Sequence, residues 1–467
     1  MFLDVLLLNL ADLVDEYGEK KDYIVKQVAM PPMGLLYIGQ VLKDAGYLVK
    51  IYDQIVTGAT NADLLELIKK LDPKIVGFSV LIDNHWTMID LFKKLKAWNP
   101  NVVTIAGNYL ATFFPEQMMN ELDIDYCVRG EGEHIFLSLV DHVLKNKKNI
   151  SDIKGIVYRE NDKLKSTPLP DHIQDLDALP IPDRKLIDFN YRLEGKSTGV
   201  LSSRGCPFKC KFCNFSTVMG KKWRSRSANN VFEEIQLLAE QGYQNILFAD
   251  DNFTLNKKRI YQLSEEIRKN KLDYIRFSGD CRIDNTNLDL MKSLVAMNCK
   301  RIVFGIESGN QRILDYYQKQ ITIEMIKQSV KTAKKAGMDY ILGSFILGAP
   351  DETFEEAKNT VVFANKLELS FIALQILSTI QISPLYDEIV AKGLYKPKED
   401  DWKRMLSVPE ICPTPVSLKS LQKLADEGFV RFFGKKYMIK LVLDSLRKNF
   451  YIDSFIQLMK NLRMGGI

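Results

Sequence analysis

The chain has 467 residues, of which 46% are hydrophobic and 26% are charged, and its formal net charge is +5. This size indicates a globular protein of two or three domains. No run of eighteen apolar residues occurs, which excludes an ordinary membrane-spanning helix. Seven cysteines, three of them within eight residues, do not form a disulfide framework and indicate a reducing cytoplasm.

The first 145 residues alternate short apolar runs with helical patterns. Strands are expected at Val5–Asn9, Leu48–Tyr52, Ile75–Ser79, Val102–Ala106 and Tyr126–Val128, and helices at Met33–Ala45, Asn61–Lys70 and Thr87–Trp98. The run Leu3–Leu10 is expected to contain this first strand rather than a signal peptide, because it lacks a basic leader. The alternation predicts an α/β domain with a doubly wound parallel sheet, whose ligands bind beyond the carboxyl ends of the strands.

A polar, proline-bearing stretch at 146–190 is expected to be a linker, with a hairpin at Gly155–Ser166. The alternation resumes over 191–385, with strands expected at Val200–Ser203, Asn245–Ala249, Tyr274–Ser278, Arg301–Gly305, Tyr340–Ile346 and Phe371–Leu377. Six β/α units predict a partial (β/α)6 barrel of the TIM type, with its site at the carboxyl ends of the strands. Residues 386–467 are expected to form a helical cap.

Three cysteines follow the first strand of this second domain with the spacing C-x3-C-x2-C: Cys206, Cys210 and Cys213. Three thiolates on one loop bind three corners of a [4Fe–4S] cluster and leave the fourth iron open to a small molecule. The alternative is a zinc site, which needs a fourth cysteine or histidine nearby. The nearest such residues, His172 and Cys281, are distant in sequence, so the spacing favours the cluster.

The three cysteines, with Phe212 just before the third, resemble the motif of the radical S-adenosylmethionine (SAM) superfamily. The resemblance implies that the open iron holds SAM and that one-electron reduction cleaves SAM to a 5′-deoxyadenosyl radical. It also implies SAM contacts in three segments at strand ends, 248–253, 304–309 and 344–352. The residues expected to make these contacts are Asp250, Asp251, Glu307, Ser308 and Gly348.

The same strand-end residues also suit purely structural roles. Asp250 and Asp251 precede a helix that begins near Asn256, and aspartate is a common helix cap. Gly348 is also what a tight turn alone would require. Arg282, on the loop after the third strand, is expected either to pair with a carboxylate or to be a solvated charge.

The first domain resembles the cobalamin (B12)-binding domain that precedes the cluster domain in one class of this superfamily. The matching segments are Pro31–Tyr37, Ala45–Asp53, Val76–Ser79 and Asp125–Glu133. The resemblance implies corrin contacts at Ser79, Leu81, Gly107, Asn108, Gly130 and Glu131. The chain departs from the pattern in lacking an Asp-x-His-x-x-Gly run and in having Asn108 and Tyr109 after Gly107, where the family commonly has a second glycine. The alternative is a domain that keeps the fold without the ligand.

The resemblance implies an enzyme with a [4Fe–4S] cluster, SAM and cobalamin as cofactors, which transfers a methyl group to a carbon atom of a small-molecule or lipid-like substrate. Its reductant is expected to be a flavodoxin or ferredoxin. Without cobalamin, the same radical would serve a cyclisation, an oxidation or a rearrangement.

Two further classes of protein share features of the cysteine motif: tRNA methylthiotransferases and non-catalytic zinc or iron–sulfur proteins. The methylthiotransferases have a different layout, with three cysteines in the N-terminal domain. Only Cys127 precedes the cluster loop in this chain, so no nucleic-acid partner is expected.

The last 51 residues, Ser417 to Ile467, contain ten Lys or Arg and four Asp or Glu, a net charge of +6. Basic helices rich in aromatic residues can lie on anionic membranes, so one expectation is peripheral membrane contact by a cytoplasmic protein. The alternative is a solvated helical cap over the barrel.

Overall fold

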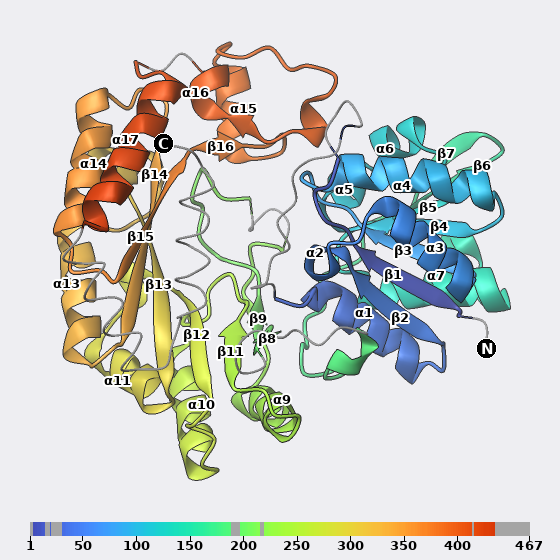
Figure 1. The fold of residues 1–467 in the computed structure, drawn as a ribbon, viewed down its shortest axis with the longest axis horizontal. Helices are drawn as coiled ribbons and strands as arrows, with labels where there is room; N and C mark the ends of the chain where they lie inside the picture. The colour runs from blue at the N-terminus through green and yellow to red at the C-terminus, as the bar shows by residue number, and fades with distance from the viewer. Residues whose placement is uncertain are drawn as a thin grey trace.

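The computed structural model describes residues 3–14, 19, 30–187, 197–214, 219–412 and 415–434. They form two α/β units, which lie side by side with the N-terminal unit on the right in Figure 1. Among these residues, no helix is long and apolar enough to cross a membrane.

The N-terminal unit is built on a seven-stranded sheet with the order β2-β1-β3-β4-β5-β6-β7. Its first five strands are parallel and its last two are antiparallel. The strands are β1 (Val5–Asn9), β2 (Val49–Asp53), β3 (Ile75–Ser79), β4 (Val103–Gly107), β5 (Tyr126–Val128), β6 (Ile156–Glu160) and β7 (Lys163–Ser166). The helices are α1 (Met33–Asp44), α2 (Gln54–Thr57), α3 (Asn61–Leu71), α4 (His85–Trp98), α5 (Asn108–Phe113), α6 (Pro115–Glu121) and α7 (Gly132–Lys145). β3 is buried along its whole length, as is typical of a parallel strand with helices on both faces.

The predicted doubly wound sheet is confirmed, and its five parallel strands lie within one residue of their expected positions. The hairpin expected near Gly155–Ser166 is also present as β6 and β7. Because β6 pairs with β5, this hairpin extends the first sheet. Part of the stretch expected to connect the domains therefore packs with the N-terminal unit.

The second unit is an open, all-parallel sheet of six strands with the order β15-β14-β13-β12-β11-β8. The strands are β8 (Ser197–Val200), β11 (Asn245–Phe248), β12 (Arg276–Cys281), β13 (Cys299–Glu307), β14 (Tyr340–Leu347) and β15 (Phe371–Ile376). The helices between them are α9 (Ala228–Glu240), α10 (Lys257–Lys269), α11 (Leu288–Ala296), α12 (Gln311–Tyr316), α13 (Ile323–Lys335) and α14 (Phe354–Lys366). The edge strands β8 and β15 are not paired with each other, so the predicted partial barrel is confirmed.

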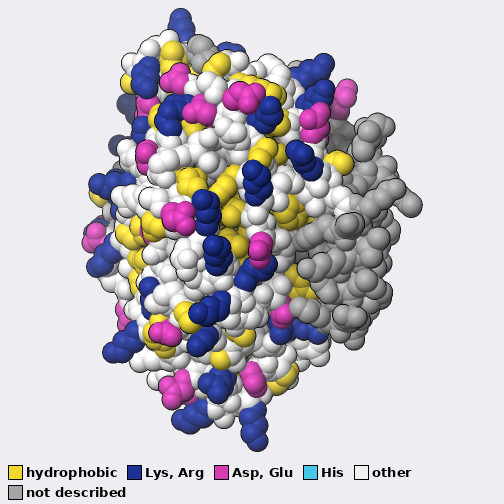
Figure 2. Space-filling view, turned by 90° about the vertical axis from the view of Figure 1, so that its left-hand side faces the viewer, with side chains coloured by type: hydrophobic (Ala, Val, Ile, Leu, Met, Phe, Trp, Pro, Cys, Tyr) yellow, Lys and Arg dark blue, Asp and Glu magenta, His cyan; other side chains and the backbone are white. Residues whose placement is uncertain are grey.

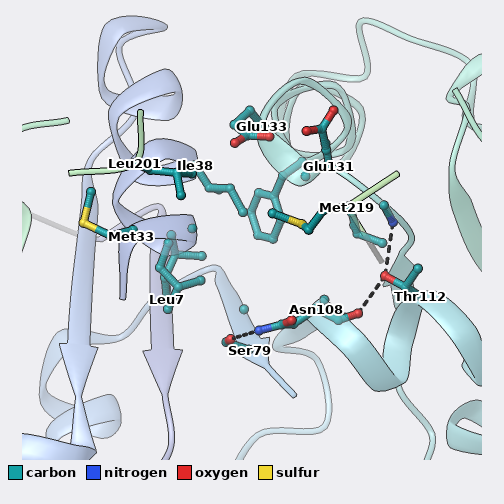
Figure 3. A pocket seen from close by; sticks show the side chains of 18 of the residues that line it. Leu7, Met33, Ile38, Ser79, Asn108, Thr112, Glu131, Glu133, Leu201 and Met219 are labelled. Carbon is teal, nitrogen blue, oxygen red and sulfur yellow. Dashed lines mark hydrogen bonds between the residues drawn. The ribbon is translucent and has the colours of Figure 1, made fainter. Parts of the chain in front are cut away.

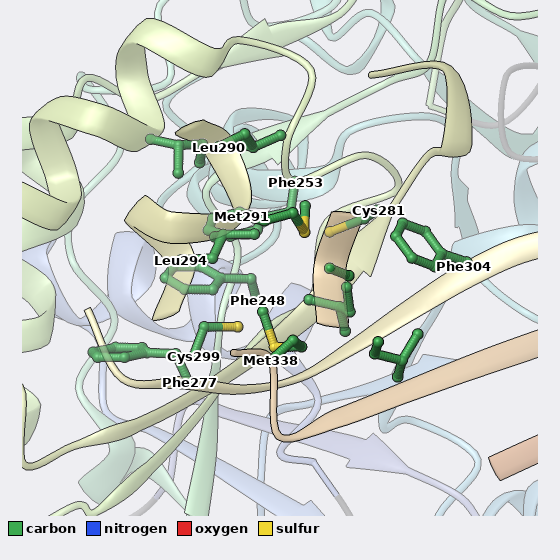
Figure 4. Close-up of a cluster of buried hydrophobic side chains, with 14 of the residues drawn as sticks. Phe248, Phe253, Phe277, Cys281, Leu290, Met291, Leu294, Cys299, Phe304 and Met338 are labelled. Carbon is green, nitrogen blue, oxygen red and sulfur yellow. The ribbon is translucent and has the colours of Figure 1, made fainter. Parts of the chain in front are cut away.

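A hydrophobic core fills the space between this sheet and its outer helices (Figure 4). Phe248 and Phe253 stack at a centroid distance of 3.9 Å, and Phe277 packs beside them. On β12 the buried residues alternate with less buried ones, of which Asp280 is exposed although it lies within a strand. The opposite face of the sheet is therefore partly open.

The largest differences from the predicted strand bounds, up to three residues, occur at β12 and β8. β12 begins at Arg276 and continues to Cys281, because the alternation that buries Phe277 and Cys281 extends beyond the predicted end, whereas Tyr274 is 58% exposed. β8 ends at Val200. A separate two-residue strand, β9 (Ser203–Arg204), follows and pairs antiparallel with β10 (Arg224–Ser225). This short pairing closes the base of the cysteine-bearing loop.

The C-terminal region lies over one end of the barrel (Figure 1). It contains α15 (Pro384–Ala391), β16 (Ser378–Thr379) paired with β17 (Leu406–Ser407), α16 (Val408–Ile411) and α17 (Leu418–Phe432). Phe429 and Phe433 pack against Phe371 of β15. The described part of the basic C-terminal segment is thus a cap on the barrel, and residues 435–467 lie outside the described residues. Basic and acidic side chains are interspersed on the outer helical face that Figure 2 shows.

Candidate functional site

The three cysteines lie on the loop that β9 and β10 close. The N–H of Cys206 donates to Gly220 O at 3.2 Å, and that of Cys213 donates to Cys210 O at 3.1 Å. Gly205 has a φ of +83° and approaches Lys222 O so closely that a Cβ would lie 2.6 Å from it, so only glycine fits. Burial raises the pKa of the Cys206 thiol, while a backbone hydrogen bond at Phe208 and the nearby positive charge of Arg282 oppose that rise.

Two cations flank the aromatic residues of this loop. The guanidinium of Arg282 lies 3.5 Å from the ring centroid of Phe208, and the ammonium of Lys319 lies 5.7 Å from that of Phe212. Arg282 also approaches the sulfur of Cys210, with Nη1 3.8 Å from Sγ. Positive charge is therefore concentrated where thiolates would carry negative charge, which suits a cluster bound at this loop.

The zinc alternative needs three or more ligands that converge on one point. Among the residues that the structure describes, no group of three His, Cys, Asp or Glu side chains is arranged to hold a single metal ion. The thiolates of a cubane cluster each bind a different iron, so they need not converge on one point. The spacing of Cys206, Cys210 and Cys213 along one loop is therefore compatible with the cluster.

Asp250 and Asp251 follow β11 directly and differ in their surroundings. The carboxylate of Asp250 accepts hydrogen bonds from the Ser202 N–H at 2.6 Å and from the Ser203 hydroxyl at 2.6 Å. Within the described chain, Asp251 accepts one bond, from the Gly205 N–H at 3.2 Å, beside the first cysteine. Burial raises the pKa of Asp251 to about 6. Neither aspartate caps α10, because Asn256 is its N-cap residue.

Glu307 and Ser308 end β13. Glu307 has a φ of +68°, and its carboxylate pairs with Lys319 at 2.6 Å, with both side chains less than a tenth exposed. Ser308 is fully buried, and its hydroxyl shares a 3.1 Å hydrogen bond with Thr360 of α14. Glu307 therefore lies beside the cysteine loop through Lys319, whereas Ser308 connects β13 to α14.

Gly348 follows β14 with a φ of +93° and packs against the C-terminal cap, where a Cβ would lie 2.9 Å from Pro409. Its N–H donates to Glu352 at 2.5 Å. The glycine thus serves a tight turn in contact with the cap. Burial raises the pKa of Glu352 to about 7, and the hydrogen bonds from two backbone N–H groups offset only part of that rise.

Asn252 is a candidate that sequence reasoning missed. It is 1% exposed, and neither atom of its side-chain amide has a hydrogen-bond partner among the described residues. A buried amide without partners is costly unless a ligand supplies them. Its place directly after Asp250 and Asp251 was the only sequence indication, because burial cannot be read from the pattern.

A cavity of about 300 Å³ lies between the two units, at the carboxyl ends of the strands of the first sheet (Figure 3). The N-terminal unit contributes residues such as Leu7 and Ser79, and the second unit contributes Leu201 and Met219. At the lining residue Gly130, with a φ of +85°, a Cβ would meet nothing within 4 Å. Backbone is therefore open to a ligand there.

Five of the six residues predicted to contact a corrin line this cavity: Ser79, Gly107, Asn108, Gly130 and Glu131. The side chain of Asn108 donates to the Ser79 hydroxyl at 2.9 Å, and the Asn108 carbonyl accepts from Thr112, as Figure 3 shows. Leu81 lies outside the lining and is 41% exposed.

A buried ion-pair network joins the two units along the cavity wall. Glu131 pairs with Arg204 and Arg224, each at 2.9 Å, and Glu133 pairs with Arg204 at 2.5 Å. Burial opposes the ionisation of Glu131, but the two guanidinium groups outweigh it and lower its pKa. Glu133 was not among the predicted contacts. It is 3% exposed, and its Oε2 has no partner in the part of the chain that the structure describes, so it can accept a hydrogen bond from a ligand amide.

Comparison with known proteins agrees with this geometry. Residues 25–140 match the B12 binding domain family and residues 200–364 match the Radical SAM superfamily. An uncharacterized methyltransferase of Pyrococcus horikoshii is 36% identical over 420 residues, which is 89% of this chain and 90% of that protein. The cytidylyl-2-hydroxyethylphosphonate methyltransferase of Streptomyces wedmorensis is 28% identical over 430 residues, 79% of each chain.

Among solved structures, the radical SAM methyltransferase TsrM from Kitasatospora setae, with cobalamin and a [4Fe–4S] cluster bound, superposes with a TM-score of 0.68. The match covers 84% of this chain and 75% of that chain at 18% identity, so it shows a shared fold. The Radical SAM match implies a [4Fe–4S] cluster and SAM, and the B12 binding domain match is consistent with cobalamin as a third cofactor. The chain belongs to the radical SAM superfamily, in its cobalamin-dependent methyltransferase family.

Proposed function

We propose that this enzyme transfers a methyl group to a carbon atom of a small-molecule substrate, with the cluster loop and the cavity of Figure 3 as its two cofactor sites. The observation that supports this most directly is that the cavity is lined by both units. When bound, cobalamin would supply the methyl group, and the cluster would supply the electron that cleaves SAM. The division into residues 1–145 for the corrin, 191–385 for the cluster and 386–467 for the cap is part of the proposal.

The chain's own residues have distinct proposed roles around SAM. Cys206, Cys210 and Cys213 hold the cluster, and Asp251 and Asn252 are placed to receive the ammonium and other polar groups of SAM. A carboxylate with a single backbone partner retains free lone pairs for such a cation. Asp250, Glu307, Ser308 and Gly348 act mainly by holding the strand ends in place, because each has partners within the chain.

Around the corrin, open backbone at Gly107 and Gly130 allows close approach, and the Ser79–Asn108 pair and Glu133 offer polar contacts. Glu131 holds the wall through its two arginines. Leu81 is not assigned a contact, since it lies outside the lining. The substrate would lie on the partly open face of the barrel sheet, where Asp280 and Gln375 are exposed within strands.

The reductant is proposed to be a small acidic protein such as a flavodoxin or ferredoxin, acting in the cytoplasm. Lys209, Lys221 and Lys222 are exposed in the segment 197–232, which contains no Asp or Glu, whereas its arginines are buried in ion pairs with glutamates that lie outside this segment. Such a charge would attract an acidic carrier to the cluster. The double variant Lys209→Gln/Lys221→Gln should slow cluster reduction by flavodoxin several-fold at low salt. It should leave reduction by dithionite unchanged, and equal slowing with both reductants would contradict this role.

The decisive experiment is anaerobic reconstitution with iron, sulfide and hydroxocobalamin, followed by reduction with SAM present. We expect one cobalamin per chain, 5′-deoxyadenosine release that the triple Cys206→Ala/Cys210→Ala/Cys213→Ala variant abolishes, and release of S-adenosylhomocysteine that depends on cobalamin. Nucleoside release without cobalamin-dependent S-adenosylhomocysteine would favour cyclisation, oxidation or rearrangement instead. Nucleoside release by the triple variant at the parental rate would refute the cluster site.

A further inference from the structure

Arg282 follows β12 and is buried beneath the cysteine loop, with a side chain that is 10% exposed. Its Nε and Nη2 donate to the two carboxylate oxygens of Asp284 at 2.9 and 3.0 Å. Nη2 also donates to Lys319 O at 2.8 Å. A bidentate pair fixes the plane of a guanidinium group, so the orientation of Arg282 is set from two separate segments.

The remaining nitrogen faces the cluster loop. Because a guanidinium is planar, Nη1 points away from the edge that holds Asp284, and it lies 3.8 Å from the sulfur of Cys210. The same group stacks on Phe208, at 3.5 Å from the ring centroid, between Cys206 and Cys210 in sequence. The positive end of the Arg282–Asp284 pair is therefore directed at a cluster ligand.

We propose that Arg282 is a positioning residue that raises the reduction potential of the cluster by holding positive charge and an N–H donor against Cys210. The proposal rests on the cluster assignment within the proposed function and not on methyl transfer. A reduced cluster carries one more negative charge than an oxidised one, so a nearby fixed cation favours the reduced form. Hydrogen bonds to cluster sulfurs act in the same direction.

The test is a redox titration of the reconstituted cluster followed by electron paramagnetic resonance, without SAM or cobalamin. Arg282→Gln and Arg282→Met remove the charge, and the methionine can still pack on Phe208. Each should lower the equilibrium constant for reduction on the order of tenfold, which is 59 mV for a one-electron couple. Arg282→Lys keeps the positive charge but lacks the bidentate guanidinium group, so its reduction potential should lie between those of wild type and the neutral variants.

Arg312 supplies the matched control, because it also makes a bidentate pair, with Glu356 at 2.6 and 2.7 Å, and donates to a backbone carbonyl, Asp351 O, at 3.0 Å. Arg312→Gln should leave the potential unchanged. The proposal is overturned if Arg282→Gln or Arg282→Met binds a cluster whose reduction potential equals that of wild type. This holds even if the variant binds SAM more weakly. The proposal is also overturned if Arg312→Gln shifts the potential equally. A chain that holds a cluster but transfers no methyl group would fail the proposed function and leave this result intact.

Discussion

Asp250 and Asn252 are two residues apart, yet the structure gives them opposite roles. Asp250 engages its carboxylate with Ser202 and Ser203, which start the cysteine loop. Asn252 is buried with an amide that nothing in the described chain satisfies. A side chain that costs folding energy without a partner is a better ligand candidate than one that is fully engaged.

This contrast gives a residue-scale prediction for SAM. Asn252→Ala should raise the Kd for SAM about tenfold, roughly the loss of one to two hydrogen bonds, because a buried donor and acceptor are removed. The free energy of unfolding without ligand should stay within about 1 kcal/mol of wild type, since no hydrogen bond within the described chain is lost. Equilibrium dialysis of SAM on the reconstituted enzyme measures the first quantity, and chemical denaturation measures the second.

Asp250→Asn is the control, and it should destabilise the protein by about 1–3 kcal/mol because it disturbs a buried acceptor. If Asn252→Ala instead destabilised the protein as much and left the Kd unchanged, Asn252 would be a structural residue. At this scale the prediction of the three cysteine ligands depends only on their spacing in the sequence, and it stays a prediction. The sequence did not separate Asp250 from Asp251, because the partner Ser202 is 48 residues away.

The turn after β14 is the element whose stability should depend most clearly on pH. Glu352 is 1% exposed, and burial raises its pKa from 4.5 to about 7. Between those values the folded state keeps a proton that the unfolded state releases, so stability falls as pH rises through this window. At 1.36 kcal/mol per unit, the full loss above pH 7 is about 3 kcal/mol.

Glu352→Gln should therefore have a higher thermal midpoint than wild type at pH 8 and show no such advantage at pH 5. Glu356, one turn further on, provides a control of opposite sign, because its hydrogen bond with Arg312 lowers its pKa to about 2. Glu356→Gln should be less stable than wild type at pH 8. If the difference in thermal midpoint between wild type and Glu352→Gln were the same at pH 5 and pH 8, Glu352 would not titrate as inferred.

Element boundaries were predicted best where a strand is a short, nearly continuous buried run. β1 and β3 match their predicted ranges because both are continuous buried runs. The β9–β10 pairing was not predicted, since two residues per strand are too few for a periodic pattern. The sequence also did not predict that the β6–β7 hairpin joins the first sheet. Strand β5 was predicted, but its pairing with β6 is a tertiary contact that a local pattern does not reveal.

At the scale of the whole molecule, Glu131 is one of the residues that join the two units, through its buried pairs with Arg204 and Arg224. Glu131→Gln leaves Arg224 buried beside a neutral amide, whereas Arg204 keeps its pair with Glu133, and the buried charge on Arg224 should cost about 3–5 kcal/mol. Because these arginines belong to the second unit, we expect calorimetry to resolve two unfolding transitions in the variant.

Lys43→Gln is the control for this change. Lys43 and Asp183 form an ion pair at 2.8 Å, but their side chains are 48% and 26% exposed, so the loss should stay within about 1 kcal/mol. If Glu131→Gln unfolded in a single calorimetric transition with the same midpoint temperature as wild type, the ion-pair network would not hold the units together. The order of domains was predictable from the alternation of elements, whereas the network was not, since it depends on how two separately predicted units meet.

The wall of the cavity joins Leu7, near the start of the chain, to Ala249, past its middle. A ribosome must therefore have released more than half of the polypeptide before this cavity has both of its sides. If the cavity holds the corrin as proposed, capture is a late step in maturation. Adding the vitamin to finished chains should therefore load the enzyme as fully as supplying it while the protein is being made.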